Sequence, residues 1–214
     1  MKKCLIIFAD GDTGNSLKRF FSENTSNLIK KAFIEDTVLM ASKVGCGIKI
    51  IAHGSAGDLP FLKEIAPKFR FYREEGENFS RKLYNALYFA HKSGAEETAV
   101  IRGNAPNLPF EYVDDAFGKL LAHDLVLGPT RSGGCYLIGL KRPDFELFRR
   151  LKWHDREVFH DIKIYAHRLR LKTVFLKKWY NTDDSNWKEL LKRDLLHGKI
   201  GNSAPNTKKI ITGL

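Results

Sequence analysis

Apolar and polar positions recur in two different periods along the chain, and together they predict strands separated by helices. Short apolar runs typical of buried strands occur at 4–9, 48–52, 69–72, 98–102, 125–127, 135–140 and 174–176. Apolar residues three or four positions apart predict helices over 28–44, 79–90, 113–121, 145–151, 156–169 and 187–196. Asp58 followed by Pro60 indicates the start of one more helix. This alternation is typical of a mainly parallel sheet covered on both faces, so we predict a three-layer, Rossmann-like α/β fold.

Two parts of the chain depart from the simple alternation. The link between the strands at 125–127 and 135–140 is too short for a helix, so we expect these strands to be neighbours joined by an irregular loop. The last seventeen residues lack helical periodicity and are rich in Gly, Asn and Pro. We therefore predict one α/β domain over residues 1–197 and a C-terminal tail over 198–214, either loose or packed along the surface.

Composition is that of a soluble globular domain. The 214 residues are 43% hydrophobic and 29% charged, and no apolar run approaches the ~20 residues that cross a bilayer. The apolar run after Lys3 is too short for a signal peptide with a cleavage site, so we expect a cytoplasmic protein without a membrane span. Cys4, Cys46 and Cys135 match no metal or redox spacing and are expected to be buried small side chains.

Positive charge is concentrated toward the C-terminus. Residues 141–214 hold 18 Lys and Arg against 9 Asp and Glu, whereas residues 1–140 hold 18 against 16, within a total net charge of +11. Such a region could attract nucleic acid, an acidic membrane or a phosphorylated substrate, or form an ordinary solvated surface. We favour the solvated surface and do not expect nucleic acid as a partner, because no RNA-binding signature or zinc finger accompanies the charge.

Ligands of parallel α/β sheets bind at the carboxyl ends of the strands, and this rule selects the loops 10–19, 53–58, 103–108 and 128–136. The first loop has Gly11 and Gly14 ahead of a helix start, with Lys18 and Arg19 behind them. It is either a phosphate cradle or a plain strand-to-helix turn. In the fourth loop, paired glycines at 133–134 begin a buried strand, which favours close approach of a ligand to the backbone, a bulge or tight corner being the alternative.

Two segments resemble motifs of a known family. Residues 101–108 read IRGNAPNL, similar to Ile-Gly-Ser-Asp-x-Pro-x-Leu. Residues 125–140 read LVLGPTRSGGCYLIGL, similar to Val-Leu-Gly-Pro-x-x-Asp-Gly-Gly-Tyr-Tyr-Leu-Ile-Gly-Leu, and 151–153 and 179–183 match later landmarks. The chain thus resembles, over roughly residues 3–191, small bacterial and archaeal glycosyltransferase-like proteins of the GT-A type, some of them labelled arsenosugar-biosynthesis glycosyltransferases.

The resemblance implies a nucleotide-diphospho-sugar donor, an acceptor region toward the C-terminal half, and Mg²⁺ or Mn²⁺ on the donor diphosphate. This sequence departs from the family where acids are expected: Asn104 and Ser132 stand in place of two Asp residues. His154-Asp155 replaces a Ser-Thr pair, and the first loop matches the family only at Gly14 and Arg19. Two lost carboxylates should weaken a site for a hard cation, so we assign no metal ligands.

Two interpretations follow. In the first, the protein is a divergent glycosyltransferase, or in a variant a nucleotidyltransferase, in which acids such as Asp10, Asp12, Asp155 and Asp183 or basic side chains at 18, 19, 102 and 131 compensate. In the second, it is a catalytically silent binder of nucleotides, of an anionic polymer or of a protein partner. For the first, the catalytic candidates are Asp155 and Asp183, and the acceptor is unassigned. The predicted nucleotide and donor contacts are Ala9, Asp10, Gly11, Gly14, Arg19, Arg102, Asn104, Arg131, Ser132, Gly133, Gly134 and Tyr136.

Overall fold

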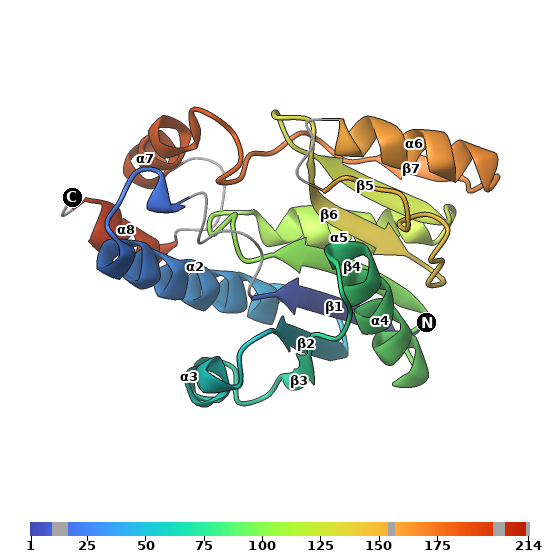
Figure 1. Ribbon diagram of the computed structural model, residues 1–214, viewed down its shortest axis with the longest axis horizontal. Helices are drawn as coiled ribbons and strands as arrows, with labels where there is room; N and C mark the ends of the chain where they lie inside the picture. The colour runs from blue at the N-terminus through green and yellow to red at the C-terminus, as the bar shows by residue number, and fades with distance from the viewer. Residues whose placement is uncertain (10–16, 154–156, 199–203, 213–214) are drawn as a thin grey trace.

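The computed structural model describes residues 1–9, 17–153, 157–198 and 204–212 of the chain (Figure 1). Its strands are β1 (Lys3–Phe8), β2 (Ile48–His53), β3 (Arg70–Arg73), β4 (Glu97–Arg102), β5 (Leu125–Pro129), β6 (Cys135–Leu140) and β7 (Thr173–Phe175). Its helices are α2 (Glu23–Lys43), the short 3₁₀ helix η1 (Ala56–Asp58), α3 (Leu59–Ile65), α4 (Phe79–Lys92), α5 (Phe110–Leu120), α6 (Val158–Arg168), α7 (Trp187–His197) and α8 (Pro205–Ile211). The predicted strands are all present, with ends shifted by one or two residues.

The seven strands form one mixed sheet in the order β3-β2-β1-β4-β6-β5-β7. Only β6 runs against its neighbours; it pairs antiparallel with β4 on one side and with β5 on the other. The predicted neighbouring pair joined by an irregular loop is therefore confirmed. Because β4 and β5 both oppose β6, the strands β1, β2, β4 and β5 all end at the same edge, which we call the carboxyl edge.

Side-chain alternation along the strands supplies the two faces of the sheet. In β1, Leu5 and Ile7 pack with α2 and α5, whereas Cys4, Ile6 and Phe8 pack on the opposite face with α4 and α6. Each fully buried aliphatic or aromatic side chain of this kind contributes about 1.5–3 kcal/mol of stabilisation. The predicted three-layer α/β arrangement is confirmed. Among the described helices, none is long and apolar enough to cross a membrane.

Helix α2 begins five residues earlier than its apolar period indicates. The Ser22 hydroxyl accepts a hydrogen bond from the Thr25 amide and so caps the first turn, whose own residues are polar. A cap of this type stabilises a helix start that apolar periodicity cannot detect. The early start makes α2 a helix of 21 residues, and its N-terminal half extends beyond the carboxyl edge (Figure 1).

One segment differs from the sequence prediction, and the C-terminal segment adopts the packed form of the two that the sequence left open. Residues 145–151 form successive turns instead of the predicted helix. The Arg149 amide donates a hydrogen bond to the Phe145 carbonyl, and the Ser80 hydroxyl donates one to the Phe148 carbonyl. The C-terminal segment contains α8, which packs against α2 although its sequence shows no helical period. The buried Asp36 carboxylate accepts hydrogen bonds from the amides of Asn206 and Thr207, at 3.1 and 2.7 Å, and so holds the start of α8.

Candidate functional site

The carboxyl edge collects the loops that the sequence selected. The loops after β2, β4 and β5 all leave from it, and the described part of the loop after β1 does as well. The Ala9 amide donates to the Ala52 carbonyl and the Gly103 amide to the Phe8 carbonyl, so three strand ends are joined side by side. The predicted gathering of loops is therefore confirmed for the residues that the structure describes, and Asp10, Gly11, Gly14 and Asp155 lie outside them.

The turn after β4 carries two of the predicted residues. Asn104 is buried, and Gly103 beside it packs so tightly that a side chain there would overlap Ile34 of α2. Arg102 lies at the end of β4 and Asn104 just beyond it, on either side of this glycine. Arg102 keeps 21% of its side chain exposed, and its Nε is buried without an acceptor among the described residues.

A loop over residues 179–184, which includes the predicted catalytic candidate Asp183, connects the turn after β4 with the loop after β5. The Thr182 amide donates to the Asn104 carbonyl at 3.2 Å, and the Trp179 amide donates to the Pro129 carbonyl at 3.1 Å. Asp184, only 3% exposed, accepts hydrogen bonds from the Asn181 amide and from the backbone and hydroxyl of Ser132. The two motif loops are thus held together through this third loop.

Asp183 is the predicted catalytic candidate that the structure describes, and it lies at the centre of this arrangement. Its Oδ2 is 3.5 Å from Arg102 Nη1, 3.5 Å from Asn104 Nδ2 and 3.3 Å from Asn181 Nδ2. The Asp183 amide donates to Asn181 Oδ1, which fixes the backbone of this residue. Three donors from two loops therefore meet one carboxylate oxygen, while 39% of the Asp183 side chain stays exposed.

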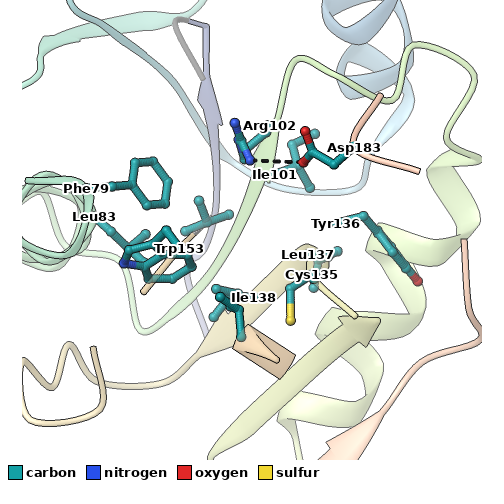
Figure 2. A pocket seen from close by; sticks show the side chains of 13 residues that line it. Phe79, Leu83, Ile101, Arg102, Cys135, Tyr136, Leu137, Ile138, Trp153 and Asp183 are labelled. Carbon is teal, nitrogen blue, oxygen red and sulfur yellow. Dashed lines mark hydrogen bonds and ion pairs between the residues drawn. The ribbon is translucent and has the colours of Figure 1, made fainter. Parts of the chain in front are cut away.

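Below the Arg102–Asp183 pair lies a small pocket between α4 and β6, drawn in Figure 2. Its wall is aromatic and aliphatic, with Phe79 and Trp153 in edge-to-face contact at 4.8 Å between ring centroids. The Trp153 ring nitrogen donates to the Ser80 hydroxyl, which fixes the indole. The cavity measures about 40 Å³, well below the roughly 300–1,000 Å³ of typical ligand pockets, so only part of a ligand fits there without side-chain movement.

A second hollow lies on the other side of β1, next to Ala9. It has a volume of about 300 Å³ between α2 and α3, and Lys31, Ile34 and Phe61 are part of its wall. The Lys31 ammonium stands 5.4 Å from the centre of the Phe61 ring. Ile34 also contacts the Gly103 turn, so this hollow and the Arg102–Asp183 pair lie on either side of the same turn.

The glycine loop after β5 is explained by its own turn. Gly133 has φ of +93°, which disfavours other residues, and the Gly134 amide donates to the Thr130 hydroxyl while its carbonyl accepts from the Thr130 amide. The tight-corner alternative therefore accounts for Gly133, and the Gly134 backbone completes the same turn. The buried Tyr136 ring packs against Gly128, and its hydroxyl donates a hydrogen bond to the Lys177 carbonyl. Figure 2 shows that the Tyr136 side chain points away from Trp153.

The remaining predicted residues are placed as follows. Arg131 is exposed on the loop after β5, and Arg19 is exposed ahead of α2; neither makes an ion pair with a carboxylate in the part of the chain that the structure describes. Lys18, a candidate counter-charge, is instead paired with Glu23 at 2.9 Å. Arg102 is thus the basic candidate that is positioned by contacts on the carboxyl edge.

Burial changes the acidity of several side chains. It raises the pKa of the Asp184 carboxyl, and the adjacent Asp183 adds to this rise, whereas the hydrogen bonds from Asn181 and Ser132 oppose it. Burial also raises the pKa of the Cys4 and Cys135 thiols to about 12, which agrees with their prediction as inert packing residues. Asp184 was not among the predicted site residues, and a buried acid beside an exposed one has no signature in a single sequence.

The described donor set does not fit a hard divalent cation. Asn104 and Ser132 bring no charge, Asp184 is occupied by buried hydrogen bonds, and Asp183 faces a guanidinium at 3.5 Å. Within the described ranges, no three His, Cys, Asp or Glu side chains stand together as metal ligands. Mg²⁺ and Mn²⁺ prefer several carboxylate oxygens, and the described residues of the carboxyl edge do not supply them.

Solved structures share this fold at low sequence identity. A candidate nucleotide-diphospho-sugar transferase from Desulfovibrio desulfuricans G20 has a TM-score of 0.84 at 20% identity, over 100% of this chain and 98% of that one. The 4-diphosphocytidyl-2C-methyl-D-erythritol synthase from Anaerococcus prevotii DSM 20548 has a TM-score of 0.60 at 13% identity, over 86% and 89%. Rv0371C from Mycobacterium tuberculosis H37Rv, in complex with manganese, has a TM-score of 0.58 at 16% identity, over 92% and 99%.

These likenesses establish a nucleotide-diphospho-sugar transferase type of fold and confirm the predicted fold class. A search of curated proteins gave no match. Residues 37–155, more than half of the 214, match the family described as "Uncharacterized protein conserved in bacteria (DUF2064)", and the chain therefore belongs to that family.

Proposed function

We propose that this protein binds a nucleotide-diphospho-sugar at the carboxyl edge and transfers the glycosyl group to an acceptor hydroxyl. The observation that carries the proposal is the meeting of Arg102, Asn104 and Asp183 at one point of that edge, from positions about eighty residues apart. The D. desulfuricans neighbour, which is described as a candidate nucleotide-diphospho-sugar transferase, supports the choice of donor class.

In this proposal the donor lies across the Gly103 turn. The hollow beside Ala9 offers the volume and the Phe61 ring that suit a nucleoside, and its lysines suit the adjoining phosphate. On the other side of the turn, Arg102 faces the diphosphate, where a guanidinium makes strong charge-assisted hydrogen bonds. The sugar then points toward the pocket of Phe79 and Trp153, whose aromatic faces suit one face of a sugar ring.

The reaction needs a base and a stabilised leaving group. Asp183 accepts the proton of the acceptor hydroxyl, whose oxygen forms the new bond to the anomeric carbon of the sugar. The bond between that carbon and the diphosphate breaks, and its electron pair leaves on the diphosphate. Arg102 stabilises the developing charge on the leaving diphosphate, which is the principal electrostatic task of the reaction.

A binding experiment tests the donor site. Calorimetric titration with a panel of nucleotide-diphospho-sugars is carried out in EDTA and again with Mn²⁺. We expect metal-independent binding, weakened at least tenfold in Arg102→Ala because a charge-assisted contact is lost. Arg168→Ala is the matched control: Arg168 ends α6, whose start lies beside Gly133, so it stands a helix length away from the carboxyl edge. Absence of binding to every donor, or equal effects of both variants, would contradict the proposal.

Product analysis separates glycosyl transfer from nucleotidyl transfer, which the fold shared with the A. prevotii synthase makes a second candidate. Glycosyl transfer releases a nucleoside diphosphate, whereas nucleotidyl transfer from a nucleoside triphosphate to a phosphorylated compound releases pyrophosphate. A protein that binds the donor but releases neither product over a panel of hydroxyl and phosphate acceptors is a silent binder.

A further inference from the structure

We propose that the Asp183 carboxylate occupies the binding site of a substrate phosphoryl group and exchanges with it, so that this acid acts as an internal stand-in for the anion. The inference deepens the proposed function, because it names the atoms that receive the phosphoryl group at the same site. It requires no metal ion, and its ligand class is a diphosphate or a phosphate ester.

Three hydrogen-bond donors converge on one oxygen of Asp183. Nη1 of Arg102, Nδ2 of Asn104 and Nδ2 of Asn181 all point at Asp183 Oδ2, and they come from the end of β4, the turn beyond it and the loop before α7. One cationic and two neutral donors around a single oxygen suit a phosphate oxygen, which accepts strong charge-assisted hydrogen bonds from a guanidinium. The carboxylate satisfies these donors with a single atom.

The fit of these donors to Asp183 is incomplete. The three contacts measure 3.3–3.5 Å, at the long end of hydrogen-bond distances. Arg102 Nε is buried and has no acceptor among the described residues, although a guanidinium can donate through two neighbouring nitrogens at once. A phosphoryl group brings several oxygens, so it can occupy the position of Oδ2 and also supply an acceptor to Nε, which the single carboxylate oxygen does not.

The Asp183 side chain can rotate away while the three donors stay in position. The Asp183 backbone amide donates a hydrogen bond to Asn181 Oδ1, and this bond fixes the backbone. The neighbouring Asp184 accepts hydrogen bonds from Ser132, which anchor the loop. Arg102 is fixed from the other side, with its guanidinium 5.8 Å from the centre of the Phe79 ring. Rotation of the 39%-exposed Asp183 side chain therefore opens the donor cluster while the cluster itself stays in place. The displaced carboxylate is then available to the acceptor hydroxyl only after the phosphoryl group has bound.

The test uses inorganic pyrophosphate as the probe, in EDTA, with the full chain. Asp183→Asn should tighten pyrophosphate binding about tenfold, because the competing carboxylate is removed without loss of side-chain volume. Asp115→Asn is the control with the same change of charge; Asp115 pairs with Lys119 on the surface of α5, and we expect its effect to stay within twofold. An unchanged or weaker affinity of Asp183→Asn overturns the proposal.

A double-mutant cycle separates exchange from general repulsion between charges. If Asp183 competes for Arg102, the gain from Asp183→Asn should fall below twofold in the Arg102→Ala background. A gain that persists in full in that background overturns the proposal, because long-range repulsion would then explain it. If Arg102→Ala fails to fold, as judged by thermal melting, Arg102→Lys replaces it; a lysine cannot donate from two nitrogens, so the gain should fall to about a third or less.

Failure of this inference is distinguishable from failure of the proposed function. Pyrophosphate binding that tightens in Asp183→Asn, with no binding of any nucleotide-diphospho-sugar, supports the exchange and contradicts the donor. Binding of a nucleotide-diphospho-sugar that Asp183→Asn leaves unchanged supports the donor and overturns the exchange. As a direct readout, the side-chain amide resonances of Asn104 and Asn181 should shift when pyrophosphate is added to the unaltered protein, and unshifted resonances count against the exchange.

Discussion

Asp183 and Asp184 are adjacent in sequence, but they belong to two different regions of the molecule. Asp184 faces the interior, is 3% exposed and accepts hydrogen bonds from Asn181 and Ser132. Asp183 faces the carboxyl edge, is 39% exposed in its side chain and meets Arg102 at 3.5 Å. Asp184 holds the loop, and Asp183 faces the proposed position of the ligand. Two carboxylates of the same kind therefore differ in role: the buried one supports the loop, and the exposed one is accessible at the carboxyl edge.

The hydrogen bonds around Asp184 extend this difference into the motif loop. The Gly134 amide donates to the Thr130 hydroxyl, the Thr130 hydroxyl lies 3.0 Å from the Ser132 hydroxyl, and Ser132 donates to Asp184. Ser132 stands where the glycosyltransferase-like proteins that this chain resembles have an acid. Through its hydrogen bonds to Asp184 it helps to hold the loop in place. The side proposed to face the anion is made by Arg102, Asn104 and Asn181.

The largest expected effect follows from the holding role of Asp184. Asp184→Ala leaves the buried Asn181 amide without its acceptor, so we expect a loss of about 2–3 kcal/mol in the free energy of unfolding. Urea denaturation of both proteins measures this loss. Asp183→Ala is the matched control, because it removes the neighbouring acid of the same length. Equal stability of the two variants would show that the comparison between the acids is wrong.

A third acid tests whether buried carboxylates elsewhere in the molecule also hold segments. Asp36 in α2 accepts the amides of Asn206 and Thr207, and α8 has only seven residues, too few to be stable alone. We expect Asp36→Ala to lower the free energy of unfolding by about 1–2 kcal/mol and to remove the hydrogen-exchange protection of α8 amides. Protection of α8 equal to that of the unaltered protein would contradict this role.

Much of the fold could be predicted from the sequence, because strands and most helices leave a local period. The turns at 145–151 were predicted as a helix, since Leu147, Phe148 and Leu151 have helical spacing. Instead, the Ser80 hydroxyl donates a hydrogen bond to the Phe148 carbonyl of these turns, and the two residues are 68 positions apart. The start of helix α8 likewise donates hydrogen bonds to Asp36, which is 170 positions away from Asn206. Contacts of this range leave no local pattern.

The candidate site was predictable in outline for a related reason. The carboxyl-edge rule and the motif resemblance selected Arg102, Asn104 and Asp183, which the structure brings within 3.5 Å. The motif did not reveal that the turn itself requires Gly133 and that Tyr136 is a packing residue. It also did not separate Asp183 from Asp184, because burial is a property of the folded chain.

The pH dependence of stability is a smaller effect that sharpens the comparison. Burial raises the pKa of Asp184 in the folded protein above its ordinary value of 3.8, so the folded state binds more protons than the unfolded state in this range. Stability contributed by protonated Asp184 is then lost as the pH rises from about 3.8 through the raised pKa.

Asp184→Asn is the variant for this measurement, since it removes the titrating group and keeps one oxygen as an acceptor. The free energy of unfolding, measured in urea at intervals from pH 3.5 upward, should fall more steeply with pH in the unaltered protein than in Asp184→Asn. Parallel curves would mean that Asp184 does not prefer its protonated form in the folded protein.

The smallest expected effect is that of Asp183→Asn on stability. An exposed ion pair with a separation of 3.5 Å contributes at most about 1 kcal/mol, and the substitution keeps the volume and one acceptor oxygen, so we expect a change of less than about 0.5 kcal/mol. Urea denaturation at neutral pH measures it beside Asp115→Asn, which breaks another exposed pair. A loss above 2 kcal/mol would mean that Asp183, like Asp184, holds the loop. A near-zero change in the free energy of unfolding, together with tighter pyrophosphate binding, would mean that Asp183 acts at the carboxyl edge and is not needed for the stability of the fold.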